Sequence, residues 1–244
     1  MTARSVVLSV LLGAHPAWAT TADLLALTDG FQIREPTLRV ALTRMVAAGD
    51  LVRSADGYRL SDRLLARQRR QDEALDPRTR AWDGSWITLV VTTAGVAAPA
   101  RAAFRKTLQD IRFAELRDGV WLRPDNLCVE LPAGVRQRVR VLRSFDESPA
   151  ELAGRLWDLA AWSATGHRLL REMSAAAAVP ARFAVAAAMV RHLLTDPVLP
   201  ADLLSADWPG ARIRAAYREF AAEMTARRDR ARPGGRLEVE GVRR

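Results

Sequence analysis

The segment GFQIREPTLRVALTRM, residues 30–45, decides how the N-terminal part of this chain folds. Pro36 suits the first position of a helix, because its missing N–H has no helical partner there. On a helical wheel, Leu38, Leu42 and Met45 share one face, which predicts a buried side. The opposite face and its flank carry Thr37, Arg39, Val40, Thr43 and Arg44. The pattern predicts a helix that packs on one side and reads a partner with the other.

Two further helices are expected on the N-terminal side of this segment. Residues 4–12 are mostly apolar, and Thr20 or Thr21 can cap a second helix that ends at Asp29-Gly30. The start of the chain also imitates a secretory signal peptide, with a small-residue cleavage site at residues 17–19. We favour the helical interpretation, because the apolar run is short and supplies the first helix of the same domain.

A short hairpin is expected on the C-terminal side. Its strands are Leu51–Arg53 and Tyr58–Leu60, and a turn with Asp56-Gly57 joins them. Three helices and a hairpin predict a winged helix-turn-helix, whose recognition helix enters the major groove of DNA while basic wing residues meet phosphate. For each arginine, a solvated surface side chain is the alternative. The predicted DNA-binding residues are Thr37, Arg39, Val40, Thr43, Arg44, Arg53 and Arg59.

Charge and composition favour a nucleic-acid partner. The chain has 244 residues, a net charge of +9 and a pI near 11.1, which suits a protein that binds a polyanion. Lys106 is the lone Lys, so a composition biased towards Arg codons is an alternative cause. No apolar run approaches the roughly 20 residues of a membrane helix. The single Cys128 fits a cytoplasmic protein, and its apolar neighbours predict a core thiol.

The whole sequence predicts an α+β multidomain protein. Strand candidates near residues 86–92, 113–116, 120–123, 128–131 and 139–145 alternate with helices from about 99 to 111 and from 149. This approximates βαββαβ alternation and indicates a ferredoxin-like α/β domain. The expected parts are a winged helix-turn-helix (1–63), a helical connector (64–80), a ferredoxin-like central domain (81–148), a helical C-terminal domain (149–232) and a flexible tail (233–244).

Three stretches together resemble the PaaX family of transcriptional regulators, the phenylacetic acid degradation repressors. They are residues 30–35 running into 38–45, Trp82-Asp83-Gly84-Ser85-Trp86, and Asp196-Pro197-Val198-Leu199-Pro200 followed by Leu203-Leu204 and Asp207-Trp208-Pro209-Gly210. The resemblance covers nearly the whole chain. Pro36 and Thr37 depart from the more polar or larger pair expected there, which leaves the operator sequence open.

The resemblance implies a three-part regulator with a winged helix, a central ferredoxin-like domain similar to the Cas2 fold, and a helical C-terminal domain. It also implies a homodimer that represses aromatic catabolic operons until an acyl-CoA, phenylacetyl-CoA in the namesake, releases it from the operator. The expected partners are therefore double-stranded operator DNA, a second copy of the chain and an acyl-CoA-type effector. The sequence identifies no residues of an effector pocket.

The sequence predicts no enzyme, cofactor or metal site. A Cas2-like domain suggests a metal-dependent nuclease, but Thr92-Thr93 stand where the end of the first strand would need a carboxylate. The three histidines lack zinc-ligand spacing, and the tryptophans are interpreted as core residues rather than a ligand platform. An activator of the same family, and a protein-interaction module with an incidental winged helix, are the alternative functions.

Overall fold

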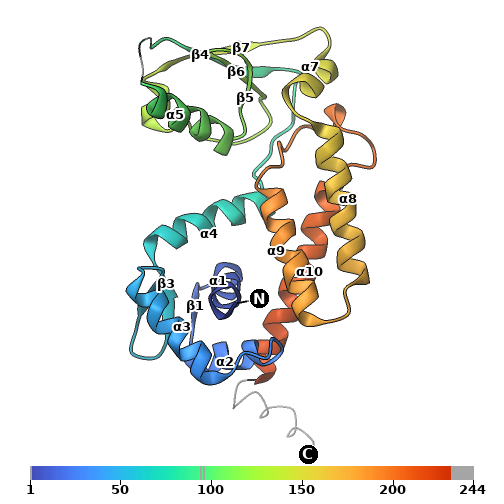
Figure 1. The fold of residues 1–244 in the computed structure, drawn as a ribbon. Coiled ribbons are helices and arrows are strands. Elements are labelled where there is room, and N and C mark those ends of the chain that lie inside the picture. Colours follow the sequence, from blue (N-terminus) through green and yellow to red (C-terminus); the bar gives the residue numbers. More distant parts are fainter. Residues whose placement is uncertain (1, 94, 96, 232–244) are drawn as a thin grey trace, which may run out of the picture. The chain divides into compact units, whose positions relative to one another are not determined.

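The computed structural model describes residues 2–93, 95 and 97–231, and Figure 1 traces the chain through them. Contacts divide the chain into a first unit, residues 1–72, 169–191 and 212–244, and a second unit, residues 73–168 and 192–211. The C-terminal helices thus contribute to both units, and the domain boundaries expected from the sequence stay a prediction. The expected tail, residues 233–244, lies outside the described residues. Among the helices described, none is both long and apolar enough to cross a membrane.

The first unit begins with the three helices and the hairpin that the sequence predicts. Its elements are α1 (Ala3–Gly13), β1 (Trp18–Ala19), α2 (Thr21–Asp29), α3 (Glu35–Ala47), β2 (Leu51–Arg53), β3 (Tyr58–Leu60) and α4 (Asp62–Leu75). Thr20 caps α2, because its hydroxyl accepts a hydrogen bond from the Asp23 N–H and its own N–H donates to the Asp23 carboxylate, both at 3.0 Å. This capping box gives partners to two N–H groups that the first turn leaves free.

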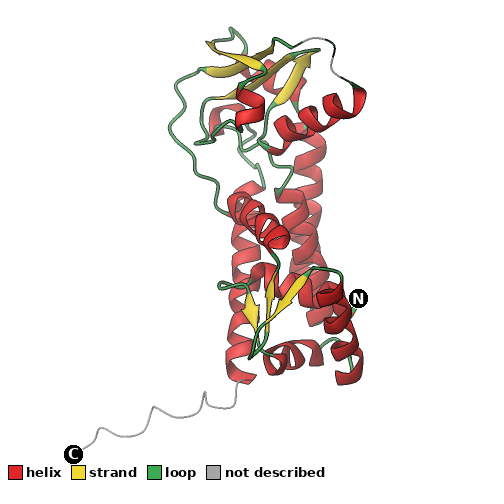
Figure 2. Cartoon of the chain, turned by 90° about the vertical axis from the view of Figure 1, so that its left-hand side faces the viewer, coloured by secondary structure: helices red, strands yellow, loops and turns green. Residues whose placement is uncertain are grey.

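Strand β1 is the element of this unit that the sequence did not predict. β3 lies between β1 and β2 in an antiparallel sheet, with Trp18 opposite Arg59, and Figure 2 shows the three strands together. Gly57 is required at the hairpin, because a Cβ atom there would overlap the carbonyl oxygen of Ala19. The residues that imitate a cleavage site therefore form part of this sheet.

The hydrophobic core of the first unit lies beneath α3. Leu38, Leu42 and Met45 are at most 1% exposed and pack with apolar side chains of α1, α2, α4, β2 and β3. Gln68 of α4 donates its side-chain amide to three carbonyl oxygens at the end of α1, at 3.3, 3.1 and 2.8 Å. These bonds satisfy acceptors that the last turn of a helix leaves without partners.

C-terminal helices complete the first unit. The last third of the chain forms α8 (Leu159–Ala175), α9 (Val179–Leu193) and α10 (Gly210–Ala231). Phe183 of α9 lies edge-on to Phe31, which follows α2, and to Phe220 of α10, with ring centroids 5.1 and 5.9 Å apart. Such edge-to-face pairs stabilise a buried contact beyond the area that they cover. The segment that leads into α3 is therefore anchored to helices distant in sequence.

Asp50 ties the end of α3 to α1 and α4. Its carboxylate is 3% exposed and accepts hydrogen bonds from Arg4 at 2.8 Å and from Arg63 at 2.5 Å. Its N–H donates to the Met45 carbonyl at 2.9 Å, and its carbonyl accepts from the Ser61 N–H at 3.0 Å. A carboxylate is stable in a buried position only when such partners replace its hydration.

Asp50→Asn is expected to lower the free energy of unfolding by about 1–2 kcal/mol, because it weakens two charge-assisted hydrogen bonds. Chemical denaturation of the full chain measures the change. Asp56→Asn is the matched control, since Asp56 is exposed in the hairpin turn, and its effect should stay within about 0.5 kcal/mol. Equal effects of the two variants would show that Asp50 does not hold these elements together.

The second unit is a four-stranded antiparallel sheet covered on both faces. It contains β4 (Trp86–Val91), α5 (Ala98–Asp110), β5 (Ala114–Arg117), β6 (Val120–Pro124), α6 (Ala133–Arg136), β7 (Val139–Ser144), α7 (Pro149–Leu156) and the 3₁₀ helix η1 (Ala201–Leu203), with strand order β5-β6-β4-β7. Because strand side chains alternate between faces, Leu89 and Trp121 face α5, whereas Trp86 and Leu122 face α7 and η1. Figure 1 shows α5 along the sheet.

The strand predicted at residues 128–131 is wrong. This stretch follows β6 as irregular chain, and only an isolated bridge between Leu127 and Thr79 resembles sheet pairing. Cys128 is exposed, so the prediction of a core thiol is also wrong. The apolar residues of this stretch suggested a strand, but only Leu127 and Leu131 pack against the core. An irregular loop can bury two such side chains without forming a strand.

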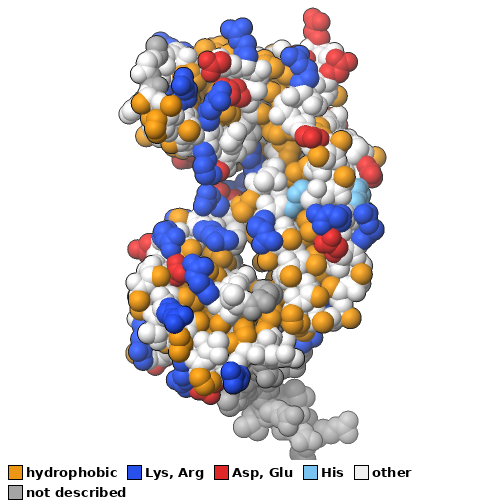
Figure 3. All heavy atoms as spheres, in the orientation of Figure 1, with side chains coloured by type: hydrophobic (Ala, Val, Ile, Leu, Met, Phe, Trp, Pro, Cys, Tyr) orange, Lys and Arg blue, Asp and Glu red, His pale blue; other side chains and the backbone are white. Residues whose placement is uncertain are grey.

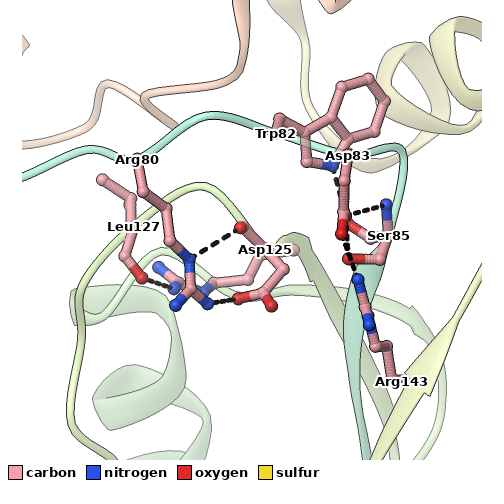
Figure 4. Close-up of polar contacts among 8 residues, drawn as sticks. Arg80, Trp82, Asp83, Ser85, Asp125, Leu127 and Arg143 are labelled. Carbon is pink, nitrogen blue, oxygen red and sulfur yellow. Dashed lines mark hydrogen bonds and ion pairs between the residues drawn. The ribbon is translucent and has the colours of Figure 1, made fainter.

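A hydrogen-bonded corner, residues 82–86, begins β4. The Asp83 carboxylate accepts bonds from the Ser85 N–H at 3.1 Å and the Ser85 hydroxyl at 2.6 Å, and it pairs with Arg143 of β7 (Figure 4). Trp82 donates its indole N–H to the Ser85 carbonyl at 2.7 Å. The bonds from Ser85, with Arg143 adding to them, lower the pKa of Asp83 to about 2.

Ser85→Ala is expected to raise the pKa of Asp83 towards the ordinary value of 3.8, because the hydroxyl bond favours the ionised carboxylate. Carbon-detected NMR titration of the Asp83 carboxyl group measures this. Since the folded pKa lies below the ordinary value, the stability that Asp83 contributes is complete above about pH 4 and is lost as the pH falls towards 2. The same pKa in both proteins would contradict the assignment.

Candidate nucleic-acid interface

α3 separates a buried face from an exposed face, as the sequence predicts. The five side chains predicted to read a partner, Thr37, Arg39, Val40, Thr43 and Arg44, are all exposed. Val40 is 50% exposed although it is apolar, and Thr43 donates its hydroxyl to the Arg39 carbonyl at 3.1 Å. The exposed face therefore mixes cations, hydroxyls and one aliphatic side chain, which are groups that contact phosphates and base edges.

The two arginines of this face differ in their partners. Arg39 donates from Nε and Nη2 to Glu35, one turn earlier, at 2.8 and 2.5 Å. Such exposed i,i+4 pairs contribute only about 0.3–0.5 kcal/mol, so Arg39 can exchange Glu35 for another anion at small cost. Arg44 is exposed and has no ion-pair partner within the described part of the chain. Arg44 is thus the cation of α3 that can bind an anion without first releasing another.

A hollow of about 650 Å³ lies between the start of α1 and the outer face of α3. Thr37, Val40 and Arg44 line it from α3, and Thr2 and Arg4 line it from α1. The structure thus brings three of the predicted residues together on one concave surface. The sequence indicated no role in this surface for the first residues of the chain, because no spacing rule relates them to α3.

The predicted wing arginines do not share a face of the hairpin. Arg53 pairs with Tyr58 and Arg59 with Val52 in the β2–β3 register, and adjacent residues of a strand point to opposite sides. Arg59 points away from the core, and its guanidinium lies 4.0 Å from the Asp62 carboxylate. Arg53 points to the other side, the side on which Tyr58 packs against the core. Both arginines are exposed, on opposite sides of the hairpin.

Further cations near α3 were not in the predicted set. Arg34 is exposed at the N-cap of α3 and makes no side-chain capping bond. α4 carries the exposed Arg63, Arg67 and Arg69, and Figure 3 shows basic side chains, here all Arg, over α4 and α3 on one face of the unit. Arg34 was visible in the sequence two residues before Pro36, at the start of the predicted helix, where the free N–H groups of a helix can meet an anion.

The tryptophans of the second unit pack on other side chains, as the sequence interpretation favoured. Trp86 and Trp121 are at most 2% exposed. Trp162 stacks on His192 and on Trp208, with ring centroids 4.1 and 4.5 Å apart. Burial lowers the pKa of His192, against the bond that it makes to the Trp162 carbonyl. Within the described residues, no three His, Cys, Asp or Glu side chains come together as a metal site would need.

Models of three domains from one protein family match most of the length of the chain. The PaaX-like protein model matches residues 2–64, the PaaX protein central Cas2-like domain matches 79–143, and the PaaX-like protein C-terminal domain matches 156–231. The chain belongs to the PaaX family. This confirms the resemblance carried by residues 30–45, 82–86 and 196–210, and membership of the PaaX family indicates a transcriptional regulator.

A solved structure is similar to this PaaX-family chain. The uncharacterized protein Rv0674 from Mycobacterium tuberculosis is 67% identical, and the match covers 94% of this chain and 98% of that one with a TM-score of 0.85. A search of curated proteins finds no match. The similarity extends across both units, and the name of that protein assigns no ligand or activity.

Proposed function

We propose that this chain is a cytoplasmic transcriptional repressor whose N-terminal winged helix-turn-helix, residues 1–63, binds double-stranded operator DNA. In this proposal α3 enters the major groove, and Thr37, Arg39, Val40, Thr43 and Arg44 face the base edges and phosphates. Arg53 and Arg59 of the hairpin meet the flanking phosphates. The central residues 81–148 form a ferredoxin-like domain, and the helices of residues 149–232 complete the regulator.

The observation that carries the proposal is the two-sided character of α3. A helix that is packed only for stability has no need of an outer face with an Arg44 that is unpaired among the described residues, an exposed Val40 and two hydroxyl side chains. The order of elements in the first unit supports the winged helix, since β2 and β3 follow α3 directly. The order β5-β6-β4-β7 supports the ferredoxin-like interpretation, because α5 and α6 connect β4 to β5 and β6 to β7.

The proposed active form is a homodimer. Two copies of α3 would then occupy successive major grooves on a palindromic operator, roughly 34 Å or a multiple of it apart. An acyl-CoA-type effector would release the dimer by binding more tightly to the arrangement that does not fit the operator, since a ligand shifts an equilibrium only by its differential affinity. Family membership supports this mechanism, and no residue of the effector pocket is assigned.

Arg44→Ala is expected to weaken operator binding about 10- to 100-fold, because an arginine contact to a base contributes roughly 1–3 kcal/mol. Fluorescence anisotropy with DNA from the promoter of the chain's own gene measures the affinity. Arg140→Ala is the matched control, since it removes the same charge from an exposed position on β7. Equal losses in the two variants would mean that net charge alone is responsible and would remove Arg44 from the interface.

The salt dependence of binding distinguishes the two ways in which Arg44 can act. If Arg44 contacts a phosphate, the slope of log affinity against log salt should fall by about 1 in Arg44→Ala. If it contacts a base, the slope is retained and discrimination between operator sequences is lost.

A mobility-shift experiment tests the proposal as a whole. Promoter fragments from the chain's own gene and its neighbours are bound at two salt concentrations, with and without a panel of aryl-CoA thioesters. Selective, salt-sensitive binding that one thioester abolishes supports the repressor. Selective binding that a thioester strengthens favours an activator of the same family. No selective binding by the folded protein at either salt concentration rejects operator recognition and favours the protein-interaction module.

A further inference from the structure

The second unit contains a cavity of about 200 Å³ between its sheet and the irregular chain that follows β6. Five apolar side chains line it, namely Ile87, Phe113, Val129, Leu131 and Val141. Two arginines, Arg123 and Arg136, are the other lining residues. Pockets that enclose drug-sized ligands are larger, from about 300 Å³ upwards, so the volume fits a single ring or a short chain.

Arg123 is buried in this cavity wall with most of its hydrogen-bonding capacity unused. Arg123 as a whole is 2% exposed, and its Nη2 donates to the Leu127 carbonyl at 2.6 Å. Nε and Nη1 are buried and have no hydrogen-bond partner among the described residues. Burial lowers the pKa of Arg123 to about 10, so the group stays charged at neutral pH. A buried cation with free N–H groups favours an anion beside it.

The neighbouring acidic group does not meet this requirement. Asp125 attracts Arg123 electrostatically, but its carboxylate and its backbone carbonyl both accept hydrogen bonds from Arg80 (Figure 4). Arg80 and Arg112 add positive charge near Arg123. The Phe113 ring lies 5.3 Å from the guanidinium carbon and offsets part of the burial cost, but a ring offers no acceptor for the free N–H groups.

Arg136 adds a second cation to the wall. It ends α6, is exposed, and has no ion-pair partner within the described chain. One buried cation, one exposed cation and apolar walls make a site that is polar on one side only. An inorganic oxyanion would leave most of its oxygens against hydrocarbon, whereas an apolar carboxylate presents its charge to Arg123 and its hydrocarbon part to the walls.

We propose that this cavity binds a small apolar carboxylate, a ring or short chain bearing one carboxylate group. The carboxylate accepts hydrogen bonds from the free N–H groups of Arg123, and the hydrocarbon part contacts Phe113, Leu131 and Val141. The inference does not rest on DNA binding, because every residue that it uses belongs to the second unit, in β4, β6, β7, the residue before β5 and the chain around α6. It concerns a free carboxylate and not the larger acyl-CoA of the proposed repressor.

Isothermal titration calorimetry of the full chain with benzoate and benzamide tests the site, since the two probes share a ring and differ in charge. Benzoate should bind at least about tenfold more tightly, because charge-assisted hydrogen bonds favour the anion. Arg123→Met should reduce benzoate affinity by about tenfold or more and leave benzamide affinity unchanged. Arg140→Gln is the matched control, since Arg140 is exposed on β7 outside the cavity lining, and should bind benzoate as the unaltered chain does.

A second variant keeps the test informative if Arg123→Met does not fold. Val141 lines the cavity and is 48% exposed, so Val141→Phe can narrow the cavity without disturbing the core. This variant should weaken benzoate binding more than acetate binding, because acetate still fits. Equal affinity for benzoate and benzamide, or phosphate competition as strong as that of benzoate, would overturn the proposal. Each readout is a ligand-binding heat, so a failure here is distinct from a failure to bind DNA.

Discussion

The carboxylate of Asp50 holds together the elements that place α3. Asp50 lies three residues after the end of α3, and its carboxylate accepts hydrogen bonds from Arg4 of α1 and Arg63 of α4, while its backbone joins the end of α3 to the start of α4. The buried leucines beneath α3 supply most of the stabilisation, because the hydrophobic effect scales with buried apolar area. The spacing of Leu38, Leu42 and Met45 determines which side of α3 is buried. The directional bonds of Asp50 add to this by holding the C-terminal end of α3 against α1 and α4.

The outer face of α3 carries two arginines that differ in how strongly they are held by other side chains. Arg44 has no acidic partner among the described residues, whereas Arg39 is held by Glu35 one turn earlier. The Glu35 pair keeps Arg39 extended along the helix in the free protein and places a negative charge beside any DNA that approaches. This arrangement weakens indiscriminate phosphate binding by Arg39 more than by Arg44, because the competing carboxylate must be displaced first. If α3 contacts DNA as proposed, the two arginines contribute differently to affinity and to selectivity, although the helical wheel treats them alike.

Local patterns were predictable from the sequence, and long-range pairings were not. The buried face of α3 follows from the spacing of Leu38, Leu42 and Met45, and the start of α2 follows from Thr20 and Asp23, because these interactions span one or two helical turns. Strand β1 has two residues and exists only because β3, some forty residues later, offers an edge and Gly57 leaves room. The Asp50 bonds join positions that no periodicity relates. Residues 128–131 have the composition of a strand, but the N–H of Cys128 donates to the Arg78 carbonyl and that of Val129 donates to Leu127, so these bonds join no strand.

Arg123 shows the same limit most clearly. In the sequence Arg123 is the last residue of the strand candidate 120–123, and no local pattern indicates that it is buried. In the fold, Arg123 lies opposite Ile87 and shares a face with Trp121, so the alternation that buries the tryptophan also buries the arginine. A buried cation that served stability alone would be better replaced by an apolar side chain of similar volume. Two nitrogens of Arg123 have no hydrogen-bond partner among the described residues, in a wall that is mostly apolar, and the ligand proposed above accounts for them better than packing does. If that ligand influences DNA binding, it must bind the two arrangements of the regulator with different affinities, which makes occupancy of the cavity and of the operator reciprocal.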